Sequence, residues 1–584
     1  MTTLDYIIIV IYFIGLLAVS FIVGRRIKSS EDMFIAGRNS SWWLSGISSY
    51  MTIFSAGTFV IWAGVAYKSG LVAVVISMCL GPASLIVGKW ISGRWRRLSI
   101  KSPGEYLDVR FGRKCLNFYT ISGMIGKTVT SAVALYSIAI MMYTVSDGKL
   151  DLYLIILVLG LITAIYTMAG GFLAVLMTDV VQFGVLFTMI LLMIPLSFHE
   201  VGGVSTFIEK ASSIPGYFSG TSESFTPLWL VLWLLLNTAM IGGDWPYVQR
   251  YVSVPTVKDA QKSTYLIGVM FLISPIIFYL PAMIYRVLVP GPGMDVDPAA
   301  MTAIGEGAYM SISRTVLMTG MVGMMMAAML SATLSLVSGA INVFANVFTL
   351  EIWGRMKRNA GASDKKRVRV GRIFTLVLGL VITGFAMLIP FAGGAEKVIV
   401  TILTMVICPL YIPSIWGLFS KRLTSTQLIA AMAVTWILGF TAKFAVPAEV
   451  LNPSLLESLS GFLVPVIVLS IMEICSARKG RQCEGFDRIS AMVDPDAEKE
   501  PGPEMKKAVK SFSFTAFNFF AVTLSAIAVL LVILLAVHEP RTMEVKGIVL
   551  WFVATIMTII AAYAAYRIID SKKSTLKTEN HECR

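Results

Sequence analysis

The chain has 584 residues, of which 56% are apolar and only 14% are charged. Soluble domains carry about 25% charged residues, so this composition excludes a soluble globular protein and predicts a polytopic membrane protein. The net charge of +14 is typical of an excess of Lys and Arg in cytoplasmic loops, and does not indicate nucleic-acid binding.

Apolar stretches long enough to cross about 30 Å of hydrocarbon predict an all-α protein with about fifteen spans. In chain order these spans lie near residues 4–24, 41–66, 71–92, 117–145, 151–169, 172–198, 227–249, 262–289, 306–349, 370–391, 396–419, 424–446, 457–475, 513–537 and 546–569. We expect the first to be no cleaved signal peptide, because its n-region at residues 1–6 carries Asp5 and no basic residue. Basic loops at 94–114 and 355–372 fall on one side, which predicts a cell-membrane protein with its N-terminus outside and its C-terminus in the cytoplasm.

Two of these spans contain sequences that weaken a continuous helix. The second span carries Ser-Ala-Gly-Thr at 55–58, and the seventh carries Gly-Gly-Asp at 242–244 followed by Pro246. Irregular backbone at membrane depth is tolerated where it lines a cavity, and a matched pair of breaks is typical of an inverted-repeat transporter. Glycine-mediated helix packing is the alternative. We expect the two repeats to begin near Ser41 and Thr226.

Asp179 lies in the segment GGFLAVLMTDVVQ, inside an otherwise apolar span. A carboxylate at the centre of a span costs roughly 2.5–3.5 kcal/mol on insertion scales, so it needs a partner or a task. One interpretation is a structural carboxylate paired with a polar neighbour. The other is a cation ligand or proton carrier, for which we expect no basic side chain as the main partner.

Six segments together resemble the sodium/solute symporter family, over about residues 5–425. They are FIAGRNSSWW, RWRRLSIKSPGEYLDVRFG, GGFLAVLMTDVVQ, VQRYVSVPTVKDAQ, NVFTLEIW and WGLFSKR, in family order and spacing. The resemblance implies a LeuT-like fold of five-plus-five inverted repeats that couples solute uptake to inward sodium flow. Solutes of the family include sugars, proline, pantothenate, iodide and sialic acid.

The resemblance also implies a main sodium site, in which this chain departs from the family at one position. Its carbonyl ligands map onto Met51, Phe54 and Ala332, and its first hydroxyl maps onto Ser335. The second hydroxyl position holds Leu336, which supplies no side-chain oxygen. A water or Thr333 substitutes for this ligand, the register slips to Ser331, or the site is weak.

A second sodium site of some family members maps onto Asp179, Ser335 and Ser338, whereas Gly339 departs from the pattern. The two serines are three residues apart and so share one helix face. A carboxylate with two hydroxyls suits Na⁺, and the same carboxylate could carry H⁺ instead. Close helix packing by small residues is the alternative for the serines.

The family's solute-binding positions are mostly small and hydroxylated in this chain. They map onto Ser55, Thr58, Ser77, Thr130 and Asn237. Thr130 stands where sialic-acid members carry an arginine, which argues against sialic acid itself. Lys127, one turn earlier, either snorkels to the membrane surface or faces the cavity, as a charge for an anionic solute or as a built-in cation.

These patterns predict an accessory helix and loop at 1–40, a transporter core at 41–420 and trailing helices at 421–476. A disordered or partly helical linker at 477–512 and a helix pair with a tail at 513–584 follow. We expect cation-coupled symport of a sugar, polyol, or small organic or amino acid, with Na⁺, the solute and the bilayer as partners. A proton-coupled or uncoupled facilitator and a membrane sensor are the alternatives. The absence of a Walker loop, a nucleophile elbow and a His pair argues against an enzyme; the oligomeric state stays open.

Overall fold

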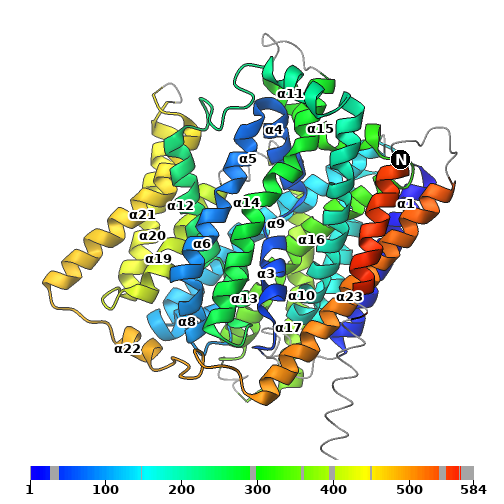
Figure 1. Ribbon diagram of the computed structural model, residues 1–584. Helices are drawn as coiled ribbons and strands as arrows, with labels where there is room; N and C mark the ends of the chain where they lie inside the picture. The colour runs from blue at the N-terminus through cyan, green and yellow to red at the C-terminus, as the bar shows by residue number, and fades with distance from the viewer. Residues whose placement is uncertain are drawn as a thin grey trace, which may run out of the picture.

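The computed structural model describes residues 2–25, 38–146, 148–289, 298–356, 361–392, 402–447, 450–537, 547–563 and 566. These residues form a bundle of helices without a β-sheet (Figure 1). The first part contains α1 (Thr3–Gly24), α3 (Trp42–Met51), η2 (Thr58–Trp62), α4 (Ala63–Ser69), α5 (Leu71–Met78), α6 (Leu80–Trp90), α7 (Ser92–Arg97), α8 (Pro103–Phe111), α9 (Arg113–Val145), α10 (Leu152–Val201) and α11 (Val204–Ser212).

The second part begins after a loop that crosses the top of the molecule in Figure 1. It contains α12 (Pro227–Gly243), α13 (Trp245–Val252), α14 (Val257–Leu288), α15 (Pro298–Val316), α16 (Met321–Val347), η3 (Phe348–Trp353), α17 (Asp364–Leu388), η4 (Ile389–Ala392), η5 (Leu403–Ile407) and α19 (Cys408–Phe419). The trailing elements are α20 (Ser425–Ala445), α21 (Pro453–Arg478), α22 (Glu484–Ser490), α23 (Pro503–Val537) and a helix at Gly547–Tyr563.

Among the described residues, ten helices are long and apolar enough to cross a membrane, and the bent pair α12–α13 makes an eleventh. Three predicted spans differ from the structure. The span at 306–349 is divided into α15 and α16, because the chain turns at Gly320 with a φ of 89°, a conformation that favours glycine. The spans at 151–169 and 172–198 are joined in α10, which stays helical through their predicted connection.

The two repeats begin where the sequence predicts, and the fold is LeuT-like. Ser41 precedes α3, and Thr226 caps α12 by accepting a hydrogen bond from Trp229 N at 3.3 Å. The second break is confirmed, since Asp244 alone separates α12 from α13 and the two axes differ by 51°.

The first break lies earlier than predicted. The chain leaves the helix after Met51 and is non-helical at 52–55, whereas the sequence predicted unwinding at 55–58. Ser55 explains the shift because it caps the second half of the broken helix. Its hydroxyl accepts a hydrogen bond from Gly57 N at 3.2 Å, and its carbonyl accepts one from Thr58 N at 2.9 Å.

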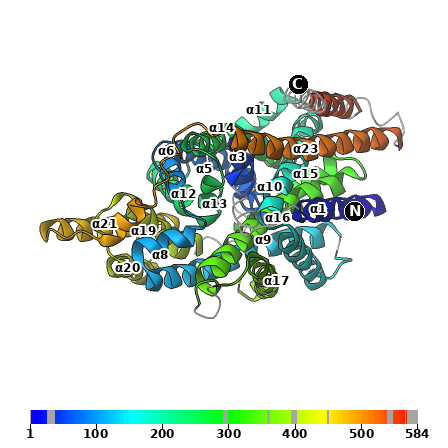
Figure 2. The same cartoon turned by 90° about the horizontal axis from the view of Figure 1, so that it is seen from below.

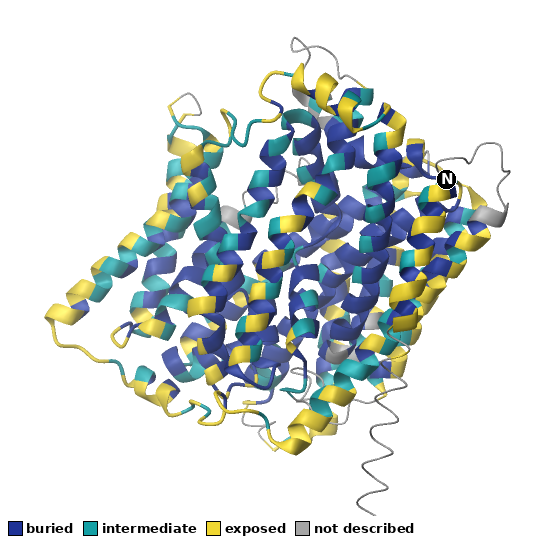
Figure 3. Cartoon of the chain, viewed as in Figure 1, coloured by how far each residue is buried: buried dark blue, intermediate teal, exposed yellow. Residues whose placement is uncertain are grey.

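The core is centred on α16, which is buried along nearly its whole length between α9, α10 and α17 (Figure 3). The outer helices α1, α21 and α23 carry the exposed apolar side chains that lipid would cover. Asp5 on α1 anchors this accessory helix to the core. Its Oδ1 accepts hydrogen bonds from Gly320 N at 2.9 Å and Gly323 N at 2.8 Å, which satisfies the N-terminus of α16.

The linker is ordered and partly helical, so the disordered alternative is wrong. Residues 479–502, here named the basal strap, run along the face that carries the basic loops and include α22 (Figures 1 and 2). Asp494 pairs with Arg96 at 3.0 Å, and Val257 N donates to Ala497 O at 2.8 Å. The strap therefore joins segments that belong to both repeats, on what we name the basal face.

Candidate solute cavity and cation site

A cavity of about 310 Å³ lies between the two helix breaks. This volume is at the small end of the range for ligand pockets, roughly 300–1,000 Å³. The structure brings all the predicted solute-binding residues into its wall: Ser55, Thr58, Ser77, Lys127, Thr130 and Asn237. They come from the first broken helix, α5, α9 and α12, which are far apart in the sequence.

The polar groups of the wall are positioned by bonds to their own helices and to neighbours. Ser77 Oγ lies 2.9 Å from Tyr279 OH, and Asn237 Nδ2 donates to Trp233 O at 2.7 Å. Thr130 Oγ1 donates to Lys127 O at 3.1 Å. A hydroxyl that donates once still has lone pairs, so these oxygens can accept hydrogen bonds from a solute.

One wall of the cavity is aromatic, which the sequence analysis missed. Trp229 and Trp233 stack with ring centroids 5.1 Å apart, and Trp62 lies 5.8 Å from Trp233. The signal was present, since Trp229 and Trp233 are four residues apart just before the second break and so share a helix face. Glu457 on α21 also lines the cavity, and no pattern in its span pointed to it.

Lys127 faces the cavity but does not offer a free charge. Its Nζ lies 2.5 Å from Asp244 Oδ2, at the second break. The snorkelling interpretation is therefore wrong. The ammonium of Lys127 faces the cavity as a cation that belongs to the chain, and it is paired with Asp244. A second, smaller cavity of about 20 Å³ lies beyond this pair and includes both residues in its wall. The hydroxyls of Tyr119 and Ser414 in that wall have no hydrogen-bond partner within the described ranges.

Asp179 is fully buried and makes the predicted contact with α16. Ser335 Oγ donates to Asp179 Oδ1 at 2.6 Å, and Ser48 Oγ donates to Oδ2. The Ser338 hydroxyl donates instead to Ser335 O at 3.1 Å.

The prediction that no basic side chain pairs with Asp179 is wrong. Arg250 Nη2 lies 3.3 Å from Asp179 Oδ2, and both side chains are completely buried. A buried carboxylate needs a compensating charge, and this ion pair is the outcome that the structural interpretation of Asp179 predicts. The sequence contained this partner, because Arg250 stands in the segment VQRYVSVP, among residues that read as buried.

The predicted main sodium site is only partly assembled. Ser335 turns to Asp179, and Leu336 lies in the cavity wall. Thr333 is the hydroxyl that reaches the break, since its Oγ1 accepts from Ala56 N at 2.8 Å and donates to Met329 O at 3.1 Å. Ser331 does not favour the alternative of a slip, because its hydroxyl donates to Ala327 O at 2.7 Å and accepts from Tyr12 OH on α1 at 2.6 Å.

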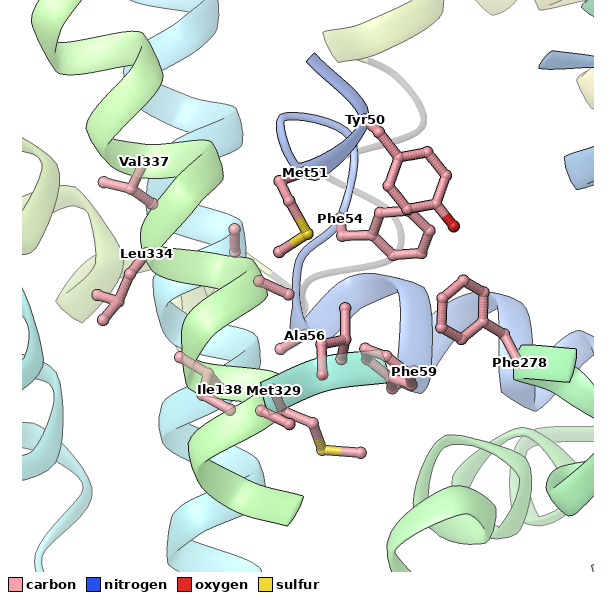
Figure 4. Close-up of a cluster of buried hydrophobic side chains, with 14 of the residues drawn as sticks. Tyr50, Met51, Phe54, Ala56, Phe59, Ile138, Phe278, Met329, Leu334 and Val337 are labelled. Carbon is pink, nitrogen blue, oxygen red and sulfur yellow. The ribbon is translucent and has the colours of Figure 1, made fainter. Parts of the chain in front are cut away.

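Figure 4 shows how apolar side chains hold the first break against α16. Met51 and Ala56 lie on the side of α16, and Met51 O accepts from Phe54 N at 3.3 Å. Phe54 points the other way, with its ring centroid 4.9 Å from that of Phe278 on α14. Ala332, the third predicted carbonyl ligand, lies inside α16 and is completely buried.

The comparisons with known proteins agree with this architecture. The chain is 26% identical to the sodium/sialic acid symporter NanT of Aliivibrio fischeri, over 65% of this chain and 75% of that protein. It is 26% identical to the rabbit (Oryctolagus cuniculus) sodium/myo-inositol cotransporter 2, over 75% and 69%. It is 27% identical to the pig (Sus scrofa) sodium/glucose cotransporter 1, over 64% and 61%.

A solved structure of a Na⁺-coupled sialic acid symporter, in a substrate-bound outward-open state, superposes with a TM-score of 0.70. It is 21% identical and covers 81% of this chain and 98% of its own. The sequence model of the sodium:solute symporter family matches residues 33–437, more than half of the chain. The chain therefore belongs to the sodium:solute symporter family.

Proposed function

We propose that this sodium-coupled symporter carries a neutral polyhydroxylated solute, a sugar or a polyol, into the cell. The observation that supports this choice is the wall of the 310 Å³ cavity, which combines hydroxyl and amide groups with a tryptophan stack. Sugars and cyclic polyols present hydroxyls at their rim and C–H groups on their faces. The hydroxyls can form hydrogen bonds with the serine, threonine and asparagine side chains, and the C–H groups can pack on the indole faces.

The Lys127–Asp244 pair favours a neutral solute over an anionic one. A solute carboxylate bound to the Lys127 ammonium would lie beside the Asp244 carboxylate, which is 2.5 Å from the same nitrogen, and the two like charges would repel. A hydroxyl can instead donate to Asp244 and accept from Lys127 without breaking the pair. Such charge-assisted hydrogen bonds are about twice as strong as neutral ones.

For the coupling ion we propose a site at Asp179, Ser335 and Ser338, with one cation transported per solute. The carboxylate and the Ser335 hydroxyl are already in contact, and Ser338 is adjacent. Leu336 leaves the main family site short of one oxygen, which favours a single ion. A proton at Asp179 is the second candidate, because the same carboxylate could carry it.

A thermal-shift screen of the purified protein tests the solute class. Glucose, myo-inositol, sialic acid and proline are each added in sodium or in choline chloride at equal ionic strength. We expect glucose or myo-inositol to raise the melting temperature in sodium and much less in choline. A shift with sialic acid or proline alone would contradict the proposal, and equal shifts in both salts across a pH series would favour the proton.

Matched variants test the cavity itself. Asn237→Ala removes a polar group of α12 from the cavity wall. Ser137→Ala removes a hydroxyl of α9 that lies outside the wall and donates to Val133 O at 2.8 Å. We expect Asn237→Ala to weaken solute binding at least fivefold, and Ser137→Ala to leave it unchanged. Equal effects would show that the cavity is not the binding site.

We further propose that the protein lies in the cell membrane with its basal face in the cytoplasm. Ser490 on the strap and Ser213 on the opposite face are both exposed. In a cysteine-free background, we expect Ser213→Cys to react with an impermeant maleimide in intact cells, and Ser490→Cys to react only after permeabilisation. The reverse pattern would invert the proposed orientation.

A further inference from the structure

The carboxylate of Asp179 is fully engaged by protein groups. One oxygen accepts from Ser335 at 2.6 Å, and the other faces Ser48 and the guanidinium of Arg250. Arg250 is held in turn, since its Nε donates to Ser48 Oγ at 2.8 Å and its Nη1 donates to Pro246 O at 2.9 Å. The buried charge is therefore neutralised by a cation that belongs to the chain.

The groups around Asp179 come from four different helices. Arg250 lies on α13 and Ser48 on α3, which are the halves of the two broken helices that lie toward the basal face (Figure 1). Asp179 and Ser335 lie on α10 and α16. Ser45 Oγ on α3 also donates to Arg250 O at 3.1 Å. One carboxylate thus ties the basal halves of both broken helices to the central helices α10 and α16.

We infer that Arg250 is a tethered cation that competes with the coupling ion for Asp179. This inference rests on the proposed cation site. A sodium ion on the carboxylate would lie close to the guanidinium in a site without solvent, where like charges repel strongly. Sodium also requires oxygens that Arg250 and Ser48 now occupy. Ion binding therefore displaces Arg250, and ion release restores it.

The competition assigns a role to the position of Arg250 on α13. When the ion is bound, α13 is no longer tied to α10; when the ion leaves, the tie is restored. Ion binding therefore frees α13, the half of the second broken helix that borders the solute cavity, and ion release fixes it again. Arg250 acts through Asp179 and is a positioning residue for coupling.

The face of α16 beside the guanidinium meets it at a glycine. A Cβ at Gly339 would lie 3.6 Å from Arg250 Nη2, so this position borders the pair and is free of side-chain atoms.

The experiment measures the sodium concentration that gives half of the maximal thermal stabilisation, with choline keeping the ionic strength constant. Arg250→Gln removes the competing charge, and we expect the half-saturating sodium concentration to fall at least tenfold. Arg250→Lys keeps the charge but loses the planar fork that reaches Ser48 and Asp179 together, so we expect a fall of about threefold. Arg96→Gln, a buried arginine that binds Val254 O and Asp494 instead, is the control and should leave the value unchanged.

An unchanged or higher half-saturating concentration in folded Arg250→Gln would overturn the inference. Should that variant fail to fold, an unchanged value in Arg250→Lys overturns it equally. Asp179→Asn separates this result from the proposed function. If Asp179→Asn leaves the sodium affinity intact, the proposed cation site is wrong. If Asp179→Asn and Arg250→Gln both lower the sodium affinity, the cation site stands and only the competition by Arg250 fails.

Discussion

Leu336 is a leucine at a position where the family resemblance calls for a hydroxyl, and the structure places it in the solute cavity wall. Its neighbour Ser335 is turned to Asp179, so the main sodium site lacks two side-chain oxygens. We predict a Hill coefficient near one for sodium activation of uptake. Leu336→Ser adds an oxygen beside the first break and should raise sodium affinity, as measured by sodium-dependent solute uptake.

Leu336→Ala is the control for this prediction, because it removes the same bulk without adding an oxygen, and we expect no gain of affinity from it. Strongly sigmoidal activation of the wild type would show that two sites work despite the leucine. One coupled ion supports roughly a 500-fold accumulation of a neutral solute, since 100 mV contributes about 2.3 kcal/mol and a tenfold sodium gradient about 1.4 kcal/mol. Two ions would square this ratio.

The ion pair of Lys127 with Asp244 gives a second prediction at the residue scale. Asp244→Asn leaves the ammonium unpaired in the cavity, which should weaken binding of a neutral polyol and lower thermal stability. Breaking a buried pair costs about 3–5 kcal/mol, and this pair is only partly exposed. The double variant Lys127→Gln/Asp244→Asn should recover most of the stability.

Melting temperatures of the single and double variants check this coupling. The exposed pair of Arg422 with Glu473 is the comparison, because Arg422→Gln should cost less than about 1 kcal/mol. Additive losses in the Lys127 and Asp244 variants would mean that the two charges do not stabilise each other.

At the scale of elements, the second break depends on close packing of α12 against α19. A Cβ at Gly243 would lie 3.0 Å from Tyr411 Cβ and 3.1 Å from Tyr411 O, so backbone would have to move. We predict that Gly243→Ala lowers both uptake and melting temperature. Gly384→Ala on α17 is the matched control, since nothing lies within 4 Å of its Cβ position and alanine favours a helix by up to about 1 kcal/mol.

Stability and uptake measured on both variants decide this prediction. If Gly243→Ala behaves like Gly384→Ala, the contact between α12 and α19 is looser than the structure indicates. The break itself would then be set by Pro246 and Asp244 alone.

At the scale of the whole molecule, the basal strap ties the two repeats through Asp494. Partial burial raises the pKa of this carboxyl, but the hydrogen bond and positive charge of Arg96 outweigh it, so the pKa lies below its ordinary value. A depressed pKa means that the contact contributes stability above about pH 4 and loses it as the pH falls through the lowered pKa. We therefore predict that the strap stays docked between pH 5 and pH 8.

Limited trypsin digestion at Lys499 checks this prediction, because cleavage requires the strap to leave the surface. Cleavage of the wild type should be slow and insensitive to pH over that interval, after correction for the activity of the protease. Asp494→Asn should be cut faster. Asp496→Asn, which removes an exposed pair with Lys499, should have little effect.

The fold was largely predictable because its evidence is local: apolar length gives the spans, Ser41 and Thr226 precede the first helix of each repeat, and the glycines at 242–243 mark the second break. The assembly of the cavity was predictable only through the family resemblance. Pairings between distant helices were not. The distance along the chain does not predict that Arg250 pairs with Asp179 or Lys127 with Asp244, because only tertiary packing brings these charges together.

These pairings have an electrical consequence for the transport cycle. Within the described spans, the acidic groups of the cavity wall and of the cation site (Asp244, Glu457 and Asp179) are each paired with a basic side chain of the same chain. The unloaded carrier thus moves little net charge when it reorients, while the loaded carrier moves the charge of its ion. Membrane voltage should accelerate the loaded step and leave the return step nearly unaffected, so that uptake currents saturate at strongly negative potentials.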